Sequence, residues 1–227
     1  MDDAHGPPAP LPDRQTAGAR LGGRLVHYQN ARPVVVALPR GGVPVAYEIA
    51  LRLRAPLDIL VVRKVGAPGN PEYGLGAVVE GGTRYLDEPR IRALGYTVRE
   101  LSPTVAQEEA EVERRARQFR CGRPPIDLRD RTVILVDDGV ATGGTVLAAL
   151  RAVRARKPQR LVLALGVAPP ETVALLRPEL DDLEVLLTPQ TFFAVGEWFR
   201  QFSQVSDREV EQLLERARER LTVGSTG

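Results

Sequence analysis

The chain has 227 residues, 43% of them hydrophobic and 26% charged, which suits one large α/β domain with a substantial core. The formal net charge of +2 gives no reason to expect nucleic-acid or membrane binding, and no apolar run is long enough to span a bilayer. A single cysteine, Cys121, excludes an internal disulfide, and residues 1–12 lack the apolar core of a signal peptide, so we expect a cytoplasmic protein.

The beginning of the chain predicts a tail and then a helix. Residues 1–14 are rich in proline and offer almost nothing to bury, so we expect a disordered tail without a function of its own. Residues 17–30 carry apolar side chains at helical spacing, and they predict a first helix that covers the core.

A first buried strand is predicted over residues 34–38, which are apolar and mostly β-branched. The turn Pro39-Arg40-Gly41-Gly42 follows, and an amphipathic helix runs from about residue 43 to residue 53. Two interpretations of this turn stay open. It is either an anion-binding loop or an ordinary strand-to-helix turn with Arg40 facing solvent.

A second apolar run, residues 57–62, predicts a strand that ends in Arg63 and Lys64. The segment 66–82 that follows is too long for a simple turn, and long ordered segments of this kind often act as lids over a ligand. A competing interpretation is a plain hairpin in which residues 77–79 pair with residues 84–86 around Gly81-Gly82. Both can hold if the lid precedes the hairpin.

The next segment, residues 88–118, is strongly charged and predicts a helix with a solvated face. Later in the chain, the apolar runs 161–167 and 183–187 predict two more strands, with a helix between them near residues 171–176. Strands that alternate with helices predict a doubly wound, mainly parallel sheet of the α/β class.

The most informative stretch is residues 131–147. An apolar run over residues 132–136 predicts a strand buried on both faces, and Asp137 and Asp138 follow it at the carboxyl edge, where open α/β sheets bind ligands. Residues 142–145, Thr-Gly-Gly-Thr, then lead into an amphipathic helix, so free N–H groups, the helix dipole and two hydroxyls converge on one point. Together these features indicate a phosphate next to a group that carboxylates bind, such as sugar hydroxyls or Mg²⁺.

Other interpretations of this stretch fit less well. A receiver domain also has an Asp pair after a strand, but near the chain start and without this helix entry. A Walker loop would need a Gly-Lys-Ser/Thr ending, which is absent from the stretch. A structural Gly-rich turn with solvated acids stays open.

Near the end of the chain, residues 188–202 contain four of the five Phe residues and the one Trp. This cluster predicts either a small hydrophobic subcore or a stacking wall for a flat ligand, to which Phe192, Phe193 and Trp198 would contribute. Ser206 and Asp207 then predict the cap of a final helix that ends at about Leu221.

The run VILVDDGVATGGT, residues 133–145, resembles the phosphoribosyl-pyrophosphate signature of the type I phosphoribosyltransferases. The resemblance implies that Asp137 and Asp138 bind the ribose hydroxyls, directly or through Mg²⁺. It implies that a loop holds the 5′-phosphate and that basic groups and glycines at earlier strand ends bind pyrophosphate. The loop consists of Ala141, Thr142, Gly143, Gly144 and Thr145, and the pyrophosphate groups are Arg40, Gly41, Gly42, Arg63 and Lys64.

Two details of the resemblance concern the acceptor. The hypoxanthine and guanine enzymes carry a further Asp in the signature, and Ala141 stands at that position here. The stretch looks more like adenine phosphoribosyltransferase, whose lid contains a Glu-Tyr-Gly similar to residues 72–74. By this resemblance Glu72 is a candidate general acid or base that acts on the acceptor nitrogen.

The expected function is therefore Mg²⁺-dependent transfer of a phosphoribosyl group between phosphoribosyl pyrophosphate and a nitrogenous acceptor of the nucleobase class. We expect a homodimer that binds no nucleic acid. The expected organisation is a tail (1–14), a core (15–187) with a flexible lid (about 64–82) and a helical excursion (about 88–120), and an aromatic hood with the final helix (188–227). The alternatives are a non-catalytic sensor of phosphoribosyl pyrophosphate or a nucleotide, and a hydrolase or phosphorylase variant of the same fold.

Overall fold

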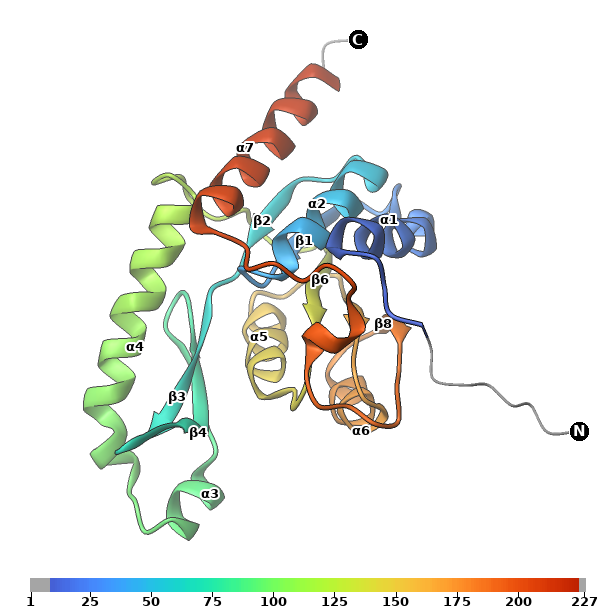
Figure 1. The fold of residues 1–227 in the computed structure, drawn as a ribbon. Coiled ribbons are helices and arrows are strands. Elements are labelled where there is room, and N and C mark those ends of the chain that lie inside the picture. Colours follow the sequence, from blue (N-terminus) through green and yellow to red (C-terminus); the bar gives the residue numbers. More distant parts are fainter. Residues whose placement is uncertain (1–8, 225–227) are drawn as a thin grey trace, which may run out of the picture.

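A computed structural model describes residues 9–224, and its core is a parallel sheet of five strands (Figure 1). The strand order is β2-β1-β6-β7-β8, and every neighbouring pair is parallel. The predicted doubly wound α/β fold is therefore confirmed. The strands are β1 (Pro33–Ala37), β2 (Leu57–Ile59), β6 (Thr132–Gly139), β7 (Arg160–Val167) and β8 (Asp182–Leu187).

Helices cover both faces of this sheet (Figure 1). Alternate residues of β1 show the division, since Val35 and Ala37 join the core beneath α1, α2 and α7, whereas Val34 and Val36 join the core beneath α5 and α6. Burial on both faces explains why the strands are continuous apolar runs. The helices are α1 (Arg14–Arg24), α2 (Gly42–Leu53), α5 (Gly144–Ala155), α6 (Pro170–Leu176) and α7 (Asp207–Gly224).

A second sheet, antiparallel and of three strands, stands beside the core. It consists of β3 (Val62–Ala67), β4 (Asn70–Val79) and β5 (Thr83–Leu86). The predicted hairpin around Gly81-Gly82 is confirmed, because β4 pairs with β5 from Val79↔Thr83 to Gly76↔Leu86.

The strand predicted over residues 57–62 is instead divided between the two sheets. β2 ends at Ile59, and Arg63 and Lys64 lie inside β3 rather than at the carboxyl edge of a core strand. The segment 66–82 is mostly strand, so its prediction as a long loop is wrong. The physical reason is burial, because Ala77 and Val79 pack against the α5 side of the core.

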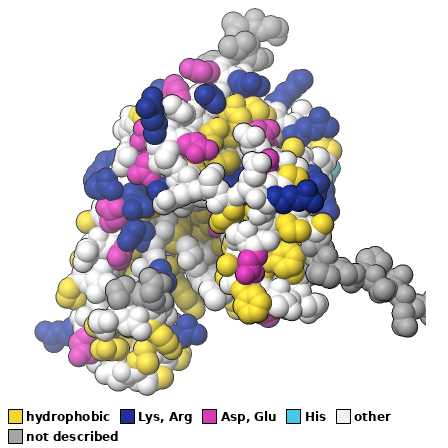
Figure 2. Space-filling view, in the orientation of Figure 1, with side chains coloured by type: hydrophobic (Ala, Val, Ile, Leu, Met, Phe, Trp, Pro, Cys, Tyr) yellow, Lys and Arg dark blue, Asp and Glu magenta, His cyan; other side chains and the backbone are white. Residues whose placement is uncertain are grey.

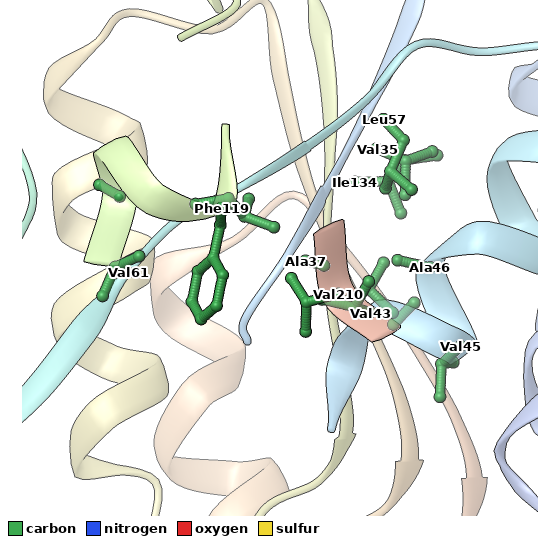
Figure 3. Close-up of a cluster of buried hydrophobic side chains, with 14 of the residues drawn as sticks. Val35, Ala37, Val43, Val45, Ala46, Leu57, Val61, Phe119, Ile134 and Val210 are labelled. Carbon is green, nitrogen blue, oxygen red and sulfur yellow. The ribbon is translucent and has the colours of Figure 1, made fainter. Parts of the chain in front are cut away.

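The charged segment predicted as one helix forms two, α3 (Glu88–Ala93) and α4 (Val98–Phe119). Thr97 and Glu100 form a capping box that starts α4. Figure 1 shows α4 running along the antiparallel sheet, and Figure 3 shows its last residue, Phe119, beside Val61, where the chain passes between the two sheets. α4 is thus the outer cover of the second sheet.

A buried ion cluster joins the two sheets. Arg120, Asp58 and Glu80 are each 4% exposed. The Arg120 guanidinium donates to Asp58 Oδ1 (2.7 Å) on β2, to Glu80 Oε1 (2.7 Å) at the end of β4, and to the carbonyl oxygen of Ile59 (2.6 Å). Because each carboxylate also accepts a backbone N–H, from Ile126 and Val61 respectively, the charges are satisfied on all sides.

The first residues that the structure describes pack against the segment that precedes the final helix. The expected disordered tail, 1–14, is wrong for its second part, because Leu11 is 1% exposed and pairs with Phe199, while Arg14 begins α1. Residues 1–8 lie outside the described residues. The predicted cap of the final helix is confirmed, since the N–H of Glu209 donates to Ser206 Oγ at 3.1 Å. Within residues 9–224, no helix combines the length and apolarity needed to cross a membrane.

The ion cluster predicts a large stability effect. We expect Arg120→Met to lower the free energy of unfolding by about 3–5 kcal/mol, because it leaves the buried Asp58 without its cation and Glu80 with only Arg156, 3.8 Å away. Urea unfolding followed by circular dichroism measures this loss. Arg92→Met is the matched control, since Arg92 and Glu88 form an exposed pair worth about 0–1 kcal/mol. Equal effects of the two substitutions would contradict the role of the cluster.

Candidate active site

The acidic pair lies at the end of β6. The ladder between β6 and β7 continues to Gly139↔Val167, so Asp137 and Asp138 belong to the strand itself rather than following it. The backbone N–H of Asp138 donates to Asp137 Oδ1 at 2.9 Å. Burial, and then the charge of Asp138, raise the pKa of Asp137 well above its ordinary value. Two adjacent carboxylates in this position favour a bound cation or hydroxyl donors.

The turn after β1 packs directly against this pair. A Cβ at Gly41 would lie 2.1 Å from Asp138 Oδ2, and a Cβ at Gly42 would lie 2.6 Å from the carbonyl oxygen of Val136. Both glycines are therefore required by close approach. The N–H of Gly42 already donates to the carbonyl oxygen of Leu38 at 3.1 Å, so the predicted binding of pyrophosphate by both glycines lacks a free N–H at Gly42.

Arg40 belongs to the same turn and is partly exposed. It follows a cis peptide bond after Pro39, its side chain is 36% exposed, and its Nη1 lies 3.6 Å from Asp207 Oδ1 at the start of α7. An exposed pair of this kind is weak, so Arg40 can exchange Asp207 for an anionic ligand at small cost.

The predicted phosphate loop connects β6 with α5. Gly143 has φ +81° and caps α5, and a Cβ there would lie 3.2 Å from Thr172 Cγ2. Thr172 also supports the loop from α6, because its Oγ1 donates to the carbonyl oxygen of Ala141 at 2.5 Å. Thr142 and Thr145 are exposed. The loop thus holds a helix N-terminus open to an anion.

This loop forms one wall of a cleft of about 580 Å³, and the antiparallel sheet forms the other. Figure 2 shows the hollow between the lower-left lobe and the rest of the molecule. Lys64 lines the wall that faces the phosphate loop. The lining residues are Lys64, Gly74, Leu75, Gly76, Tyr85, Asp87 and Arg90 on the sheet side, and Thr142, Gly144, Thr145, Leu147 and Leu175 on the core side.

The structure does not bring Arg63 to this cleft. Arg63 and Lys64 are successive residues of β3, so their side chains leave the strand on opposite faces. The Arg63 guanidinium forms an ion pair with Glu108 on α4. Of the two predicted pyrophosphate ligands on β3, only Lys64 faces the phosphate loop.

The aromatic segment mostly forms the predicted subcore, and none of its residues lines the cleft. Phe192 and Trp198 pack on a subcore of Leu11, Val167 and Phe199. Phe193 is 81% exposed and joins neither this subcore nor the cleft lining. The Glu72 side chain lies outside the described part of the chain, so its role stays a prediction.

Arg14 is the site residue that sequence reasoning missed. It is the first residue of α1, and its Nε donates to Asp138 Oδ2 at 2.7 Å. Asp13 signals the helix start, since its Oδ1 accepts from the N–H of Thr16 at 2.6 Å, as an N-cap does. Nothing local signals the partner, which lies 124 residues away in the sequence.

The acidic pair has the ligand chemistry of a Mg²⁺ site. Among residues 9–224 there is no group of three or more His, Cys, Asp or Glu side chains that could hold a metal ion. Asp137 and Asp138 supply carboxylate oxygens only, and Mg²⁺ is commonly held by one or two carboxylates together with water and ligand phosphates.

Comparisons with known proteins show which family this chain resembles. Two proteins of Mycobacterium tuberculosis, from strains CDC 1551 and H37Rv and each named "Putative phosphoribosyl transferase", are 43% identical over 205 residues. These matches cover 90% of this chain and 46% of each relative, so the chain spans about half the length of the curated relatives it matches. The crystal structure of TT1426 from Thermus thermophilus is 43% identical with a TM-score of 0.78, covering 91% of this chain and 98% of that chain.

A family model described as the phosphoribosyl transferase domain matches residues 15–192, which include both walls of the cleft and the acidic pair. The resemblance carried by residues 133–145 is confirmed. The chain belongs to the phosphoribosyl transferase domain family.

Proposed function

We propose that the protein transfers a phosphoribosyl group between phosphoribosyl pyrophosphate and a nitrogenous acceptor of the nucleobase class, with release of pyrophosphate. The observation that carries this proposal is the N-terminus of α5, which opens into the cleft opposite Lys64. A short loop connects this helix to β6, the strand that carries the acidic pair. A phosphate at one end and hydroxyls at the other are the features of a sugar phosphate.

Each part of the site has a role in this reaction. Asp137 and Asp138 accept hydrogen bonds from the ribose hydroxyls, and the loop from Ala141 to Thr145 holds the 5′-phosphate through its N–H groups and hydroxyls. Arg40 and Lys64, with the backbone at Gly41, neutralise the pyrophosphate. Mg²⁺ held by the acidic pair would add a positive charge on the pyrophosphate oxygens.

The proposed reaction requires little covalent chemistry from the side chains of the protein. The acceptor nitrogen forms a bond to the anomeric carbon while the bond from that carbon to the pyrophosphate oxygen breaks, and positive charge develops on the sugar ring. Positioning of the two reactants and neutralisation of the leaving group supply the catalysis. Glu72 as acid or base on the acceptor, a mobile lid near residues 64–82, a cytoplasmic location and a homodimer belong to the same proposal.

Thr142 provides the first test. We expect isothermal titration to show Mg²⁺-dependent binding of phosphoribosyl pyrophosphate, and Thr142→Ala to weaken it about tenfold or more, because a hydroxyl to the charged phosphate is lost. Thr104→Ala, a half-exposed threonine on α4 outside the cleft lining, is the matched control. Absence of binding by the unaltered protein under every condition would reject the proposed function.

The acceptor is tested by a screen of free bases for pyrophosphate release. We expect release only when a suitable base is present, and we expect Asp138→Asn to abolish it while leaving the protein folded. Release of pyrophosphate without any base would indicate a hydrolase, in which water is the acceptor. A reaction that requires inorganic phosphate in place of a base would indicate a phosphorylase. Tight binding with no turnover for any base would favour the sensor.

The two basic residues of β3 give a matched pair of substitutions. We expect Lys64→Met to weaken binding of Mg²⁺-pyrophosphate about tenfold, because Lys64 lines the cleft. Arg63→Met should leave this affinity within about twofold and act on stability instead, because Arg63 pairs with Glu108. The reverse order of effects in a titration would contradict the assignment of Lys64 to the leaving group.

A further inference from the structure

Arg14 makes three separate contacts at the edge of the acidic pair. Its Nε donates to Asp138 Oδ2 at 2.7 Å, and its Nη1 donates to the carbonyl oxygen of Ser203 at 2.7 Å. The guanidinium carbon lies 3.9 Å from the ring centroid of Phe202. The side chains of Arg14 and Asp138 are only 11% and 10% exposed, so water screens this ion pair weakly.

The backbone that carries Arg14 is fixed from both sides. The N–H of Leu11 donates to the carbonyl oxygen of Trp198 (2.8 Å), and the N–H of Arg200 donates to the carbonyl oxygen of Leu11 (2.8 Å). Asp13 caps α1 directly before Arg14. We call residues 11–14 together with residues 198–203 the terminal clasp. The clasp presents the guanidinium to Asp138 without further ordering of the chain.

The clasp also packs on Gly166 of β7, which neighbours the backbone of Asp138. A Cβ at Gly166 would lie 2.4 Å from the carbonyl oxygen of Asp138 and 3.0 Å from Cζ of Phe199. Phe199 stacks on Phe202, with 5.3 Å between ring centroids. Side chains of the clasp therefore lie against both β7 and the Arg14 guanidinium beside the same Asp138.

The protein encloses Asp138 Oδ2 from two sides. Arg14 donates to it from one side, and on another side Gly41 comes so near that any Cβ would overlap it. One carboxylate oxygen is thus committed to the protein, which fixes the carboxylate plane and leaves Oδ1 as the oxygen to offer to ligand hydroxyls. The guanidinium also supplies positive charge beside two neighbouring carboxylates.

We propose that Arg14 is a positioning residue for the ribose site: by holding Asp138 it raises the affinity for the ribose hydroxyls of phosphoribosyl pyrophosphate. This inference rests on the proposed function. It assigns a specificity role to a residue outside the phosphate loop, the pyrophosphate turn and the acidic pair. The rival explanation is structural, since Arg14 could act only as a tie between α1 and residues 202–203.

The two explanations differ in which ligands they affect. If Arg14 acts through Asp138, Arg14→Met weakens a ligand that contains ribose and spares one that does not. Isothermal titration would compare Mg²⁺-phosphoribosyl pyrophosphate with Mg²⁺-pyrophosphate on the full chain. We expect Arg14→Met to weaken the first about tenfold and to leave the second within about twofold. Arg20→Met, an exposed arginine on the same helix, should change neither.

A double-mutant cycle adds an independent readout. In the Asp138→Asn background, Arg14→Met should cost no more than about twofold further, because the carboxylate it positions is already gone. Arg14→Lys keeps the charge and should retain part of the affinity. It also serves as the second variant in the cycle if Arg14→Met does not fold, which thermal unfolding would reveal.

Three outcomes would overturn the inference. The first is equal binding of phosphoribosyl pyrophosphate by Arg14→Met and the unaltered protein, and the second is an equal loss for both ligands. The third is additivity of the Arg14 and Asp138 substitutions, which would leave Arg14 as a structural tie. Failure of the proposed function is distinguishable, because the unaltered protein would then bind no phosphoribosyl pyrophosphate at all, and the inference would fall with it.

Discussion

The site depends on how the antiparallel sheet is held against the parallel one, and the buried Arg120 ion cluster makes that junction. Asp58 belongs to the core strand β2 and Glu80 to the end of β4, so one guanidinium spans the two sheets. An ion cluster this buried contributes less net stability than its charges suggest, but it tolerates only one geometry. The separation between Lys64 on the second sheet and the phosphate loop on the first follows from that geometry.

The second constraint is electrostatic and lies at the acidic pair. Burial, and then the charge of Asp138, raise the pKa of Asp137 above its ordinary value and so disfavour its ionised form. Arg14 beside Asp138 and the N–H of Asp138 on Asp137 oppose this tendency. An ionised carboxylate accepts hydrogen bonds through both of its oxygens, so the groups that favour ionisation of the pair belong to the site together with the carboxylates.

Sequence reasoning succeeded where the signal is local. Continuous apolar runs identified β1, β6, β7 and β8, and the Thr-Gly-Gly-Thr entry identified the start of α5. It failed over residues 66–76, because the glycines and Pro71 conceal a strand whose pairing is set by its partner β3. The alternation that separates Arg63 from Lys64 becomes visible only once that strand is recognised.

Contacts between distant segments explain the other differences between the predictions from the sequence and the structure. Leu11 looked like part of a proline-rich tail because its partner, Phe199, stands near the other end of the chain. Residues 192–202 looked equally suited to a subcore or a stacking wall, and burial of Phe199 against Leu11 and Val167 supports the subcore for most of them. Each terminal segment alone lacks enough apolar surface to fold. Together they form a clasp, and its only charged contact with the acidic pair is made by Arg14 among the residues that the structure describes.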